Sequence, residues 1–194
     1  LDLMNQQAIR MESLVVDLLT LSKLEGSPPP AIGEWLDADE LRDQVLQDAR
    51  ALSAVMGEGA QAIESFGETG VRVAGLRSEL VSAMGNLVSN AVRYTPTDGQ
   101  ISAGWLRLPD GGVSFVVKDS GPGISPEHLP RLSERFYRVD RSRSRETGGT
   151  GLGLAIVKHV TQRHGGELHV ESTVGGGSQF TIQLPARRVK QPLP

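Results

Sequence analysis

The sequence contains no cysteine, and no stretch of it approaches the roughly 20 apolar residues that span a bilayer. Without cysteine, disulfide bonds, zinc–thiolate sites and thiol catalysis are excluded, and a reducing compartment is compatible with the composition. No signal peptide is visible. The formal net charge is only −3, so the bulk charge gives no reason to expect a nucleic-acid partner.

Aromatic residues are also scarce, at 4%, whereas glycine occurs 23 times. The glycines cluster between Gly111 and Gly177, which favours loops shaped around a ligand over a rigid aromatic core. The length of 194 residues and the hydrophobic content of 38% suit one packed domain with an appendage, or two small domains. Because the chain starts at Leu1 inside a helical pattern, we expect it to be a piece of a longer protein.

Residues 1–25 predict one long helix, because apolar residues from Met4 to Leu18 recur at alternating steps of four and three. Gly26 and the prolines that follow end this helix, so residues 26–35 are expected to form a linker. An apolar stripe of this kind fits two interpretations equally well. The helix could lie on the following domain, or it could be one half of a helical hairpin in a dimeric bundle.

The remainder predicts an α+β domain over residues 36–185 and a tail over 186–194. Helices are expected over 38–56, 76–94 and 150–163, and strands over 62–66, 71–74, 100–108, 113–118, 167–171 and 179–184. Asp37 or Asp39 could cap the first of these helices. Residues 138–149 are basic without an apolar period, which predicts a mobile loop, and the chain beyond Pro185 is expected to fray. Helices on one face of a mixed sheet give a two-layer α/β sandwich.

The first polar cluster lies in the helix expected over 76–94. Asn86, Asn90 and Arg93 are separated by four and three residues, so they share one helical face, next to Tyr94. Amide oxygens are acceptable ligands for Mg²⁺, and a guanidinium matches phosphate oxygens. An ordinary solvent-exposed polar face would explain the same spacing equally well.

The second cluster, residues 119–124, directly follows an apolar strand. Gly121 and Gly123 allow the backbone to approach a flat ligand closely, with Ile124 beside them. Asp119 at the strand end can accept a hydrogen bond from an exocyclic amine such as that of adenine. Taken alone, a tight Gly-Pro-Gly turn is the better explanation of this segment.

The third cluster, residues 148–154, opens a helix that continues from about Leu152 onward. Its members are Gly149, Thr150, Gly151, Leu152, Gly153 and Leu154. The free N–H groups of a helix N-terminus bind phosphate. The segment lacks both the full dinucleotide-binding fingerprint and the Lys-Ser/Thr pair of a P-loop. A flexible glycine-rich helix start is the alternative.

The order and spacing of the three clusters resemble the ATP-binding catalytic domain of sensor histidine kinases, within the superfamily shared with Hsp90, gyrase and MutL ATPases. Residues 86–94 are similar to the N box, 119–123 to the G1 box, 135–138 to the F box and 149–154 to the G2 box. The resemblance covers about residues 36–185 and implies the GHKL (Bergerat) fold.

Residues 10–12 and 17–25 extend the resemblance to the end of the second helix of the dimerisation and histidine-phosphotransfer hairpin. That similarity favours the dimeric-bundle interpretation for the full-length parent protein. The amino-acid sequence of these segments is most similar to that of the phosphate-regulon sensor kinases, which implies a phosphate-responsive two-component system.

The resemblance also implies an ATP site with a bound Mg²⁺. The implied ATP-binding residues are Asn86, Asn90, Arg93, Tyr94, Asp119, Gly121, Gly123, Ile124, Tyr137, Arg138, Gly149, Thr150, Gly151, Leu152, Gly153 and Leu154. Asn90 is implied to ligate Mg²⁺, with Asn86 close to the phosphates. Arg93 and Arg138 are implied to contact phosphate oxygens.

The remaining implied roles concern the base and the lid. Asp119 reads the adenine amine, Tyr94 lies along the adenine or ribose, and Ile124 and Leu154 line the base. The glycines of the G2 box let the lid fold over the triphosphate, and Phe136 anchors the lid to the domain body. The other lid arginines, at positions 141, 143 and 145, are expected to be a solvated charge run.

The histidine that the family phosphorylates is missing. His128, His159, His164 and His169 do not precede the acidic residue and Leu-Arg-Thr-Pro run of the acceptor, so all four are expected at the surface or in helix caps. No catalytic residue is therefore expected within the chain, and it should bind nucleotide without autophosphorylation. The implied partners are an acceptor hairpin of the same protein and the receiver domain of a response regulator. The parent is implied to be a homodimer acting on the cytoplasmic side of the inner membrane, and the piece itself soluble.

Two other functions remain as alternatives. The related ATPases carry a water-activating Glu where this chain has Asn86, and an amide cannot act as a general base. A GHKL-type ATPase is therefore the less favoured alternative. A nucleotide-binding interaction module, either a degenerate kinase or a scaffold, is the other.

Overall fold

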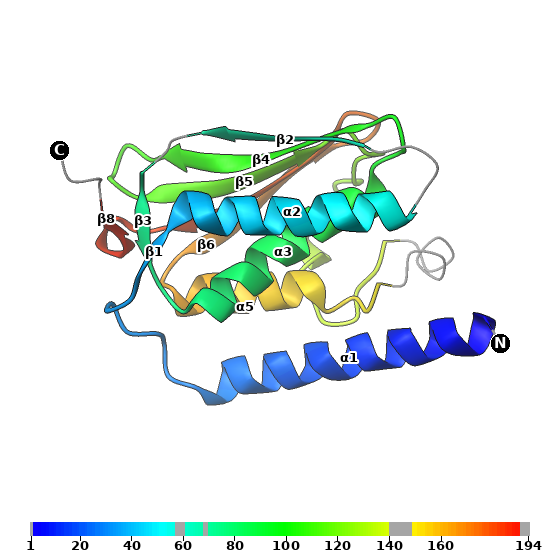
Figure 1. Ribbon diagram of the computed structural model, residues 1–194, viewed down its shortest axis with the longest axis horizontal. Helices are drawn as coiled ribbons and strands as arrows, with labels where there is room; N and C mark the ends of the chain where they lie inside the picture. The colour runs from blue at the N-terminus through cyan, green and yellow to red at the C-terminus, as the bar shows by residue number, and fades with distance from the viewer. Residues whose placement is uncertain (1, 57–60, 68–69, 140–148, 191–194) are drawn as a thin grey trace.

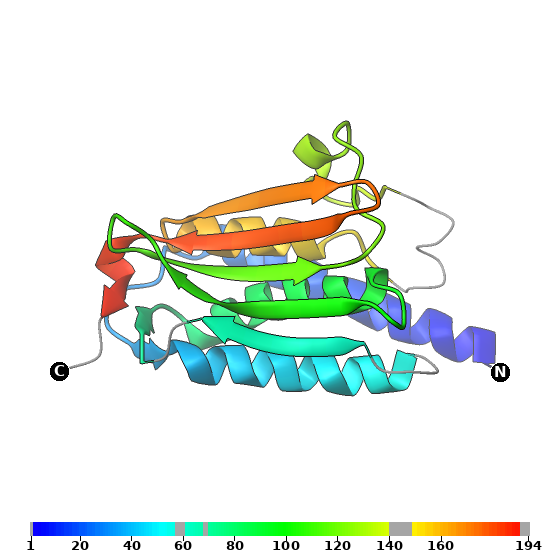
Figure 2. The same ribbon diagram turned by 90° about the horizontal axis from the view of Figure 1, so that it is seen from above.

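The computed structural model describes residues 2–56, 61–67, 70–139 and 149–190. Its larger sheet is mixed and has five strands in the order β2-β4-β5-β7-β6 (Figure 2). The strands are β2 (Ala62–Gly67), β4 (Gln100–Arg107), β5 (Val113–Asp119), β7 (Gly177–Leu184) and β6 (Glu167–Thr173). β2 pairs with β4 in parallel, and the other neighbours are antiparallel.

Three helices cover one face of this sheet (Figure 1). They are α2 (Ala38–Met56), α3 (Arg77–Tyr94) and α5 (Gly153–Arg163), with α3 between the other two. Their apolar stripes bury residues such as Leu87 and Ile156 against the sheet. The ring centres of Trp105 and Phe115 lie 5.2 Å apart in the same core, with the rings tilted against each other. The predicted two-layer α+β sandwich is therefore confirmed.

Local signals explain where the helices begin. The Asp37 side chain accepts hydrogen bonds from the N–H groups of Asp39 and Glu40 at 2.9 and 3.2 Å, so Asp37 is the cap of α2. α5 begins at Gly153, three residues later than predicted. The reason is Gly151, whose φ of 76° is left-handed and incompatible with a helical start further upstream.

A second, three-stranded sheet closes one end of the domain. Its strands are β1 (Trp35–Asp37), β3 (Arg72–Ala74) and β8 (Val189–Lys190), in the order β1-β3-β8. Trp35 belongs to a strand, although the sequence placed it in the linker. The strand predicted over 71–74 does not join the main sheet.

The expectation that the chain frays beyond Pro185 is wrong through Lys190. A short 3-10 helix, η2 (Ala186–Arg188), leads into β8. Arg188 is 5% exposed, and its guanidinium donates to the carbonyl oxygens of His164, Ala74 and Pro30 at 2.7, 3.2 and 2.8 Å. These bonds join the end of the chain to α5, β3 and the proline linker.

Helix α1 (Asp2–Gly26) forms a layer of its own along α5 (Figure 1). Leu21 and Leu24 are buried in the domain core, whereas Met11, Val15 and Leu19 are exposed. One edge of the apolar stripe therefore packs on the domain, and another apolar edge is exposed. Across the described residues, none of the helices combines the length and apolarity needed to cross a bilayer.

Candidate functional site

A cavity of about 400 Å³ lies between α3, the end of β5 and the start of α5, a size typical of ligand sites. The predicted residues that line it are Asn86, Asn90, Arg93, Tyr94, Asp119, Gly123, Ile124, Tyr137, Arg138, Gly149, Thr150, Gly151, Gly153 and Leu154. The structure thus brings the three sequence clusters together around one cavity.

Two predicted residues, Leu152 and Gly121, do not line the cavity but form hydrogen bonds with residues that do. The Leu152 side chain is buried in the core, and its N–H donates to Thr150 Oγ1 at 3.2 Å. The Gly121 N–H donates to the Asp119 carboxylate at 2.8 Å. Each therefore holds a neighbour that does line the cavity.

Helix α3 presents its polar face at the edge of the core. There Asn86 makes a hydrogen bond within α3 and lies close to Gly153 of α5. Its Nδ2 donates to the Ser82 carbonyl at 2.8 Å. A Cβ atom added at Gly153 would lie only 2.5 Å from Asn86 Oδ1. The glycine at the start of α5 therefore allows the amide of α3 to reach the cavity wall.

Asp119 marks one end of the cavity. It is the last residue of β5 and pairs with Ser178 of β7. Burial raises the pKa of the Asp119 carboxyl above its ordinary value, while hydrogen bonds from the N–H groups of Gly121 and Ser178 lower it in part. The fixed carboxylate still offers oxygen lone pairs to a donor in the cavity.

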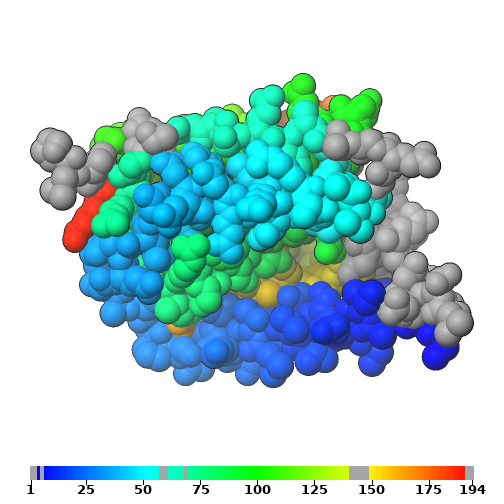
Figure 3. All heavy atoms as spheres, viewed as in Figure 1, coloured from blue at the N-terminus to red at the C-terminus, as the bar shows by residue number. Residues whose placement is uncertain are grey.

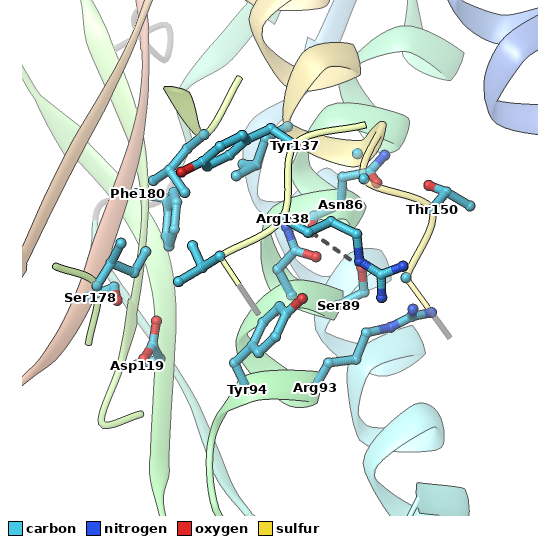
Figure 4. A pocket seen from close by; sticks show the side chains of 18 of the residues that line it. Asn86, Ser89, Arg93, Tyr94, Asp119, Tyr137, Arg138, Thr150, Ser178 and Phe180 are labelled. Atoms are coloured by element: carbon cyan, nitrogen blue, oxygen red, sulfur yellow. Dashed lines mark hydrogen bonds between the residues drawn. The ribbon is translucent and has the colours of Figure 1, made fainter. Parts of the chain in front are cut away.

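Figure 4 shows that Asp119, Ser178 and Phe180 lie together on one side of the cavity. Arg138 and Thr150 lie on the opposite side, near α5. The first side offers a carboxylate and apolar surface, which suits a flat heterocycle with an amine. The second side offers cations and a helix N-terminus, which suit an anionic group.

The cationic side is partly desolvated. Burial lowers the pKa of the Arg138 guanidinium, and the positive charge of Arg10 on α1 lowers it further. A bound anion would offset the neighbouring positive charges of Arg138 and Arg10. The site therefore has an electrostatic reason to bind phosphate oxygens.

Tyr137 forms an aromatic part of the wall and is held on both sides. Its hydroxyl lies 2.7 Å from His128 Nδ1, and the Arg131 guanidinium lies 4.3 Å from its ring centre. These contacts join the segment around η1 (Leu129–Arg131) to the cavity.

Phe136 connects the segment before the lid to the start of α5 through its backbone. Its N–H donates to the Gly151 carbonyl at 2.9 Å, and its own φ is 62°, which is unusual for a side chain of this size. A Cβ at Gly151 would lie 3.0 Å from Phe136 Cα. Phe136 is 55% exposed, so its main chain, and not its ring, makes the contact with the start of α5.

The side chains around the cavity can be compared with the ligands that Mg²⁺ requires. No group of three or more His, Cys, Asp or Glu side chains that could hold a metal occurs in the described part of the chain. Asn90 lines the cavity and lies on the same face of α3 as Arg93, three residues later. A single amide ligand fits Mg²⁺, which commonly takes one or two protein oxygens and completes its shell with phosphates and water.

Several lining residues were missed by the sequence analysis. They are Ser13, Asp17, Ser89, Pro122, Leu132, Val139, Ser178 and Phe180. Ser89 shares the α3 face with the predicted amides, so helical spacing could have found it. Ser178 could not be found in this way, because it enters through its pairing with Asp119.

Asp17, like Ser13, comes from α1 and is far along the chain from the other lining residues. Its Oδ2 accepts a hydrogen bond from Thr150 Oγ1 at 2.6 Å, across 133 positions of sequence. No local pattern in α1 indicates that one of its carboxylates reaches the cavity.

The four histidines do not line the cavity formed by the described residues. His164 is the C-terminal cap of α5, as predicted for one of the group, and it is fully buried. Its Nδ1 lies 2.8 Å from the Val160 carbonyl, and the Leu76 N–H donates to its Nε2 at 3.4 Å. Residues 140–148, which include the other predicted lid arginines, lie outside the described residues.

Comparisons with known proteins agree on one kind of domain. Residues 75–188 match the family model described as histidine kinase-, DNA gyrase B-, and HSP90-like ATPase. The chain is 46% identical over 188 residues to the phosphate regulon sensor protein PhoR of Pseudomonas aeruginosa, covering 97% of this chain and 42% of that relative. It is 39% identical over 177 residues to the sensor-like histidine kinase SenX3 of Mycolicibacterium smegmatis, covering 91% and 45%.

Solved structures give the same result. The mycobacterial sensor histidine kinase MprB matches with a TM-score of 0.68 and 31% identity, covering 80% of this chain and 98% of that chain. Full-length ShkA in complex with AMPPNP matches with a TM-score of 0.71 and 28% identity, covering 92% and 36%. The chain spans less than half the length of the two curated relatives above.

Proposed function

The chain belongs to the family of histidine kinase-, DNA gyrase B- and HSP90-like ATPases, and from that premise we propose that it is the ATP-Mg-binding catalytic domain of a sensor histidine kinase. The domain holds ATP so that the γ-phosphoryl group passes to a histidine of the same protein, and from there to an aspartate of a response regulator. The observation that carries this proposal is that one cavity has Asp119 at one end and Arg138, beside the start of α5, at the other.

The base end suits adenine. Asp119 accepts a hydrogen bond from the exocyclic amine, while Ile124 and Leu154 contact the ring faces and Tyr94 lies along the base or ribose. A buried carboxylate that accepts an N–H gives strong selection for a base that carries an amine, because a base without one leaves the acceptor unpaired.

The phosphate end suits the triphosphate and its metal. Arg93 and Arg138 contact phosphate oxygens, and Asn90 supplies an oxygen to Mg²⁺. When bound, Mg²⁺ neutralises charge that develops on the phosphates during transfer. The glycines around Gly151 let the backbone approach the phosphates closely.

The nucleophile comes from outside this cavity. Asn86 cannot activate water as a general base, which disfavours steady hydrolysis. An imidazole nitrogen placed in line with the γ-phosphate forms the new P–N bond as the bond to the bridging oxygen of ADP breaks. Alignment of this histidine by another segment therefore controls the reaction.

The relatives support a finer proposal about the parent protein. Similarity to PhoR supports a phosphate-responsive sensor kinase, and similarity to ShkA with AMPPNP, an ATP analogue, supports triphosphate binding. The exposed apolar edge of α1, with Met11 and Val15, fits the helical bundle of a homodimer. We place the parent's catalytic domain on the cytoplasmic side of the membrane, where ATP is available.

The test combines binding and transfer. Calorimetric titration of the chain with ATP-Mg should show saturable binding, and a separately produced hairpin of the parent with its acceptor histidine should become phosphorylated when mixed with the chain and labelled ATP. A chain that binds ATP but never phosphorylates the hairpin would favour an interaction module. Steady hydrolysis by the chain alone, abolished by Asn86→Ala, would favour an ATPase.

A further inference from the structure

Helix α1 contributes directly to the cavity that we assign to the nucleotide. Ser13 and Asp17 line it, although both lie in the N-terminal helix. The Asp17 carboxylate accepts the Thr150 hydroxyl at 2.6 Å, and Thr150 Oγ1 in turn accepts the Leu152 N–H at 3.2 Å. The carboxylate is therefore bonded to the loop that starts α5.

The position of α1 is defined by contacts away from the cavity. Arg163 near the end of α5 donates to the Leu24 carbonyl at 2.8 Å and to the Pro28 carbonyl at 2.9 Å, and it also pairs with Glu79 at 2.9 Å. Glu25 pairs with Arg135. Figure 3 shows α1 lying along the helical face, with α5 visible between α1 and α3.

The place that the Asp17 carboxylate occupies attracts anions. The first N–H groups of α5 and the helix dipole favour negative charge near Thr150. Arg138 lies on the same side of the cavity (Figure 4). In the described structure α1 supplies the negative charge, and a bound triphosphate would bring its own negative charge to the same end.

We propose that Asp17 is a specificity-determining residue whose carboxylate competes with the terminal phosphate of the bound nucleotide, so that docking of α1 and binding of a triphosphate oppose each other. The inference rests on the proposed function, because it takes the nucleotide to be the ligand of the cavity. By reciprocity, ATP weakens docking of α1 by the same factor by which docked α1 weakens ATP binding. ADP has a weaker effect, and adenosine has none.

The alternative is that Asp17 helps the nucleotide. A carboxylate oxygen is a favoured ligand of Mg²⁺, and Asp17 could add one to the site. This alternative predicts the opposite sign, because loss of the carboxylate would weaken ATP-Mg binding. One substitution therefore separates the two.

The experiment compares Asp17→Asn with Glu12→Gln in the full chain. The amide of Asp17→Asn can still accept the Thr150 hydroxyl, so it removes the charge and keeps the shape. Glu12→Gln removes the same charge from an exposed position of the same helix. Each protein is titrated calorimetrically with ATP-Mg, ADP-Mg and adenosine at low and high salt.

We expect Asp17→Asn to bind ATP-Mg about three- to tenfold more tightly than wild type, as one partly screened elementary charge would allow. The gain should be smaller for ADP-Mg, absent for adenosine and reduced at high salt. Glu12→Gln should match wild type. Equal or weaker ATP binding by Asp17→Asn would overturn the inference, whereas failure of wild type to bind any of the three ligands would overturn the proposed function with it.

A second measurement uses wild type alone, so it does not depend on how the variant folds. Hydrogen exchange of α1 peptides around Leu21 should accelerate when ATP-Mg is added and should stay unchanged with adenosine. An α1 that exchanges equally slowly in the presence of saturating ATP-Mg would contradict the proposed opposition.

Discussion

Two opposing effects act on the pKa of the Asp119 carboxyl at the end of β5. Burial raises the pKa of its carboxyl, and the N–H groups of Gly121 and Ser178 lower it in part. A folded-state pKa above the ordinary value of 3.8 means that folding favours the protonated form. The carboxylate therefore lowers the free energy of unfolding at neutral pH.

We predict that Asp119→Asn separates stability from binding. The variant should bind ATP-Mg at least roughly tenfold more weakly, because a buried donor or acceptor loses its partner at a cost of about 1–3 kcal/mol. Its free energy of unfolding should equal or exceed that of wild type, and the difference should grow as pH rises through the raised pKa. Urea unfolding from pH 4 to 7.5, beside calorimetric titration, would measure both effects, and a destabilised variant would contradict this account.

His164 is a buried histidine with a structural task. Burial lowers its pKa, with a smaller contribution from the positive charge of Arg188. Below the ordinary value of 6.5, the unfolded chain binds a proton that the folded chain resists. This histidine therefore makes the free energy of unfolding fall as the pH drops below about 6.5 towards its lowered pKa.

The variant His164→Leu should show a shallower loss of stability between pH 7 and pH 5 than wild type. At pH 7.5 it should be less stable by about 1–3 kcal/mol, because the Leu76 N–H loses its acceptor and the Val160 carbonyl loses its side-chain donor. His169 is exposed, so His169→Leu is the control and should leave the slope close to that of wild type. Parallel pH curves for His164→Leu and wild type would show that other groups carry the dependence.

Helices α3 and α5 approach each other closely at the cavity because Gly153 has no side chain. A Cβ at Gly153 would meet Asn86 Oδ1 at 2.5 Å, whereas a Cβ at Gly85 would meet nothing within 4 Å. The same substitution at these two positions therefore has different consequences. At Gly153 the easiest relief is a rotation of the Asn86 side chain, which breaks its bond to the Ser82 carbonyl.

We predict that Gly153→Ala weakens ATP-Mg binding about three- to tenfold, the equivalent of one displaced hydrogen-bonding group. Gly85→Ala should leave binding unchanged and raise the free energy of unfolding by about 0.5–1 kcal/mol, because alanine is the better helix former. Calorimetric titration and urea unfolding of the two variants form a matched pair. Equal affinities in both would contradict the contact between α3 and α5 that we describe.

At the scale of the whole molecule, two arginines join α1 and its linker to the domain. Arg163 contacts the chain from Leu24 to Pro28, and Arg188 contacts Pro30. Arg163 and Glu79 are nearly buried, with side chains 11% and 12% exposed. The orientation of α1 therefore follows from interactions that begin far from it in the sequence.

The variant Arg163→Ala should lower the free energy of unfolding by about 1–3 kcal/mol, because several carbonyl groups and a charged partner lose a donor. Hydrogen exchange should accelerate in α1, where the contact is lost, and remain slow in α3. Arg50 is exposed and bonds a single carbonyl, so Arg50→Ala should stay within about 0.5 kcal/mol of wild type. Unchanged exchange in α1 of the Arg163 variant would show that the linker contacts do not hold the helix.

Much of the fold could be predicted because its signals are local. The apolar period of α2 and α3, the breaks at Gly26 and Gly99, and the alternation of β4 and β5 depend on residues within a few positions of one another. The register of β7 against β5, which brings Ser178 beside Asp119, depends on a pairing across the fold. The formation of β8 near the C-terminus also depends on contacts across the fold, because Arg188 donates hydrogen bonds to carbonyl groups in three distant segments.

The sequence by itself determined most helices and strands of this protein and the glycines at which its backbone turns, and its motifs resembled those of a family that binds ATP. The helices, strands and turns follow from backbone sterics and from periodicity, which act over one or two turns of chain. Only the tertiary structure decided that Asp119, the polar face of α3 and the start of α5 share one cavity. It alone placed Asp17 against Thr150, because a contact across 133 positions is selected by packing of the whole core and leaves no local pattern.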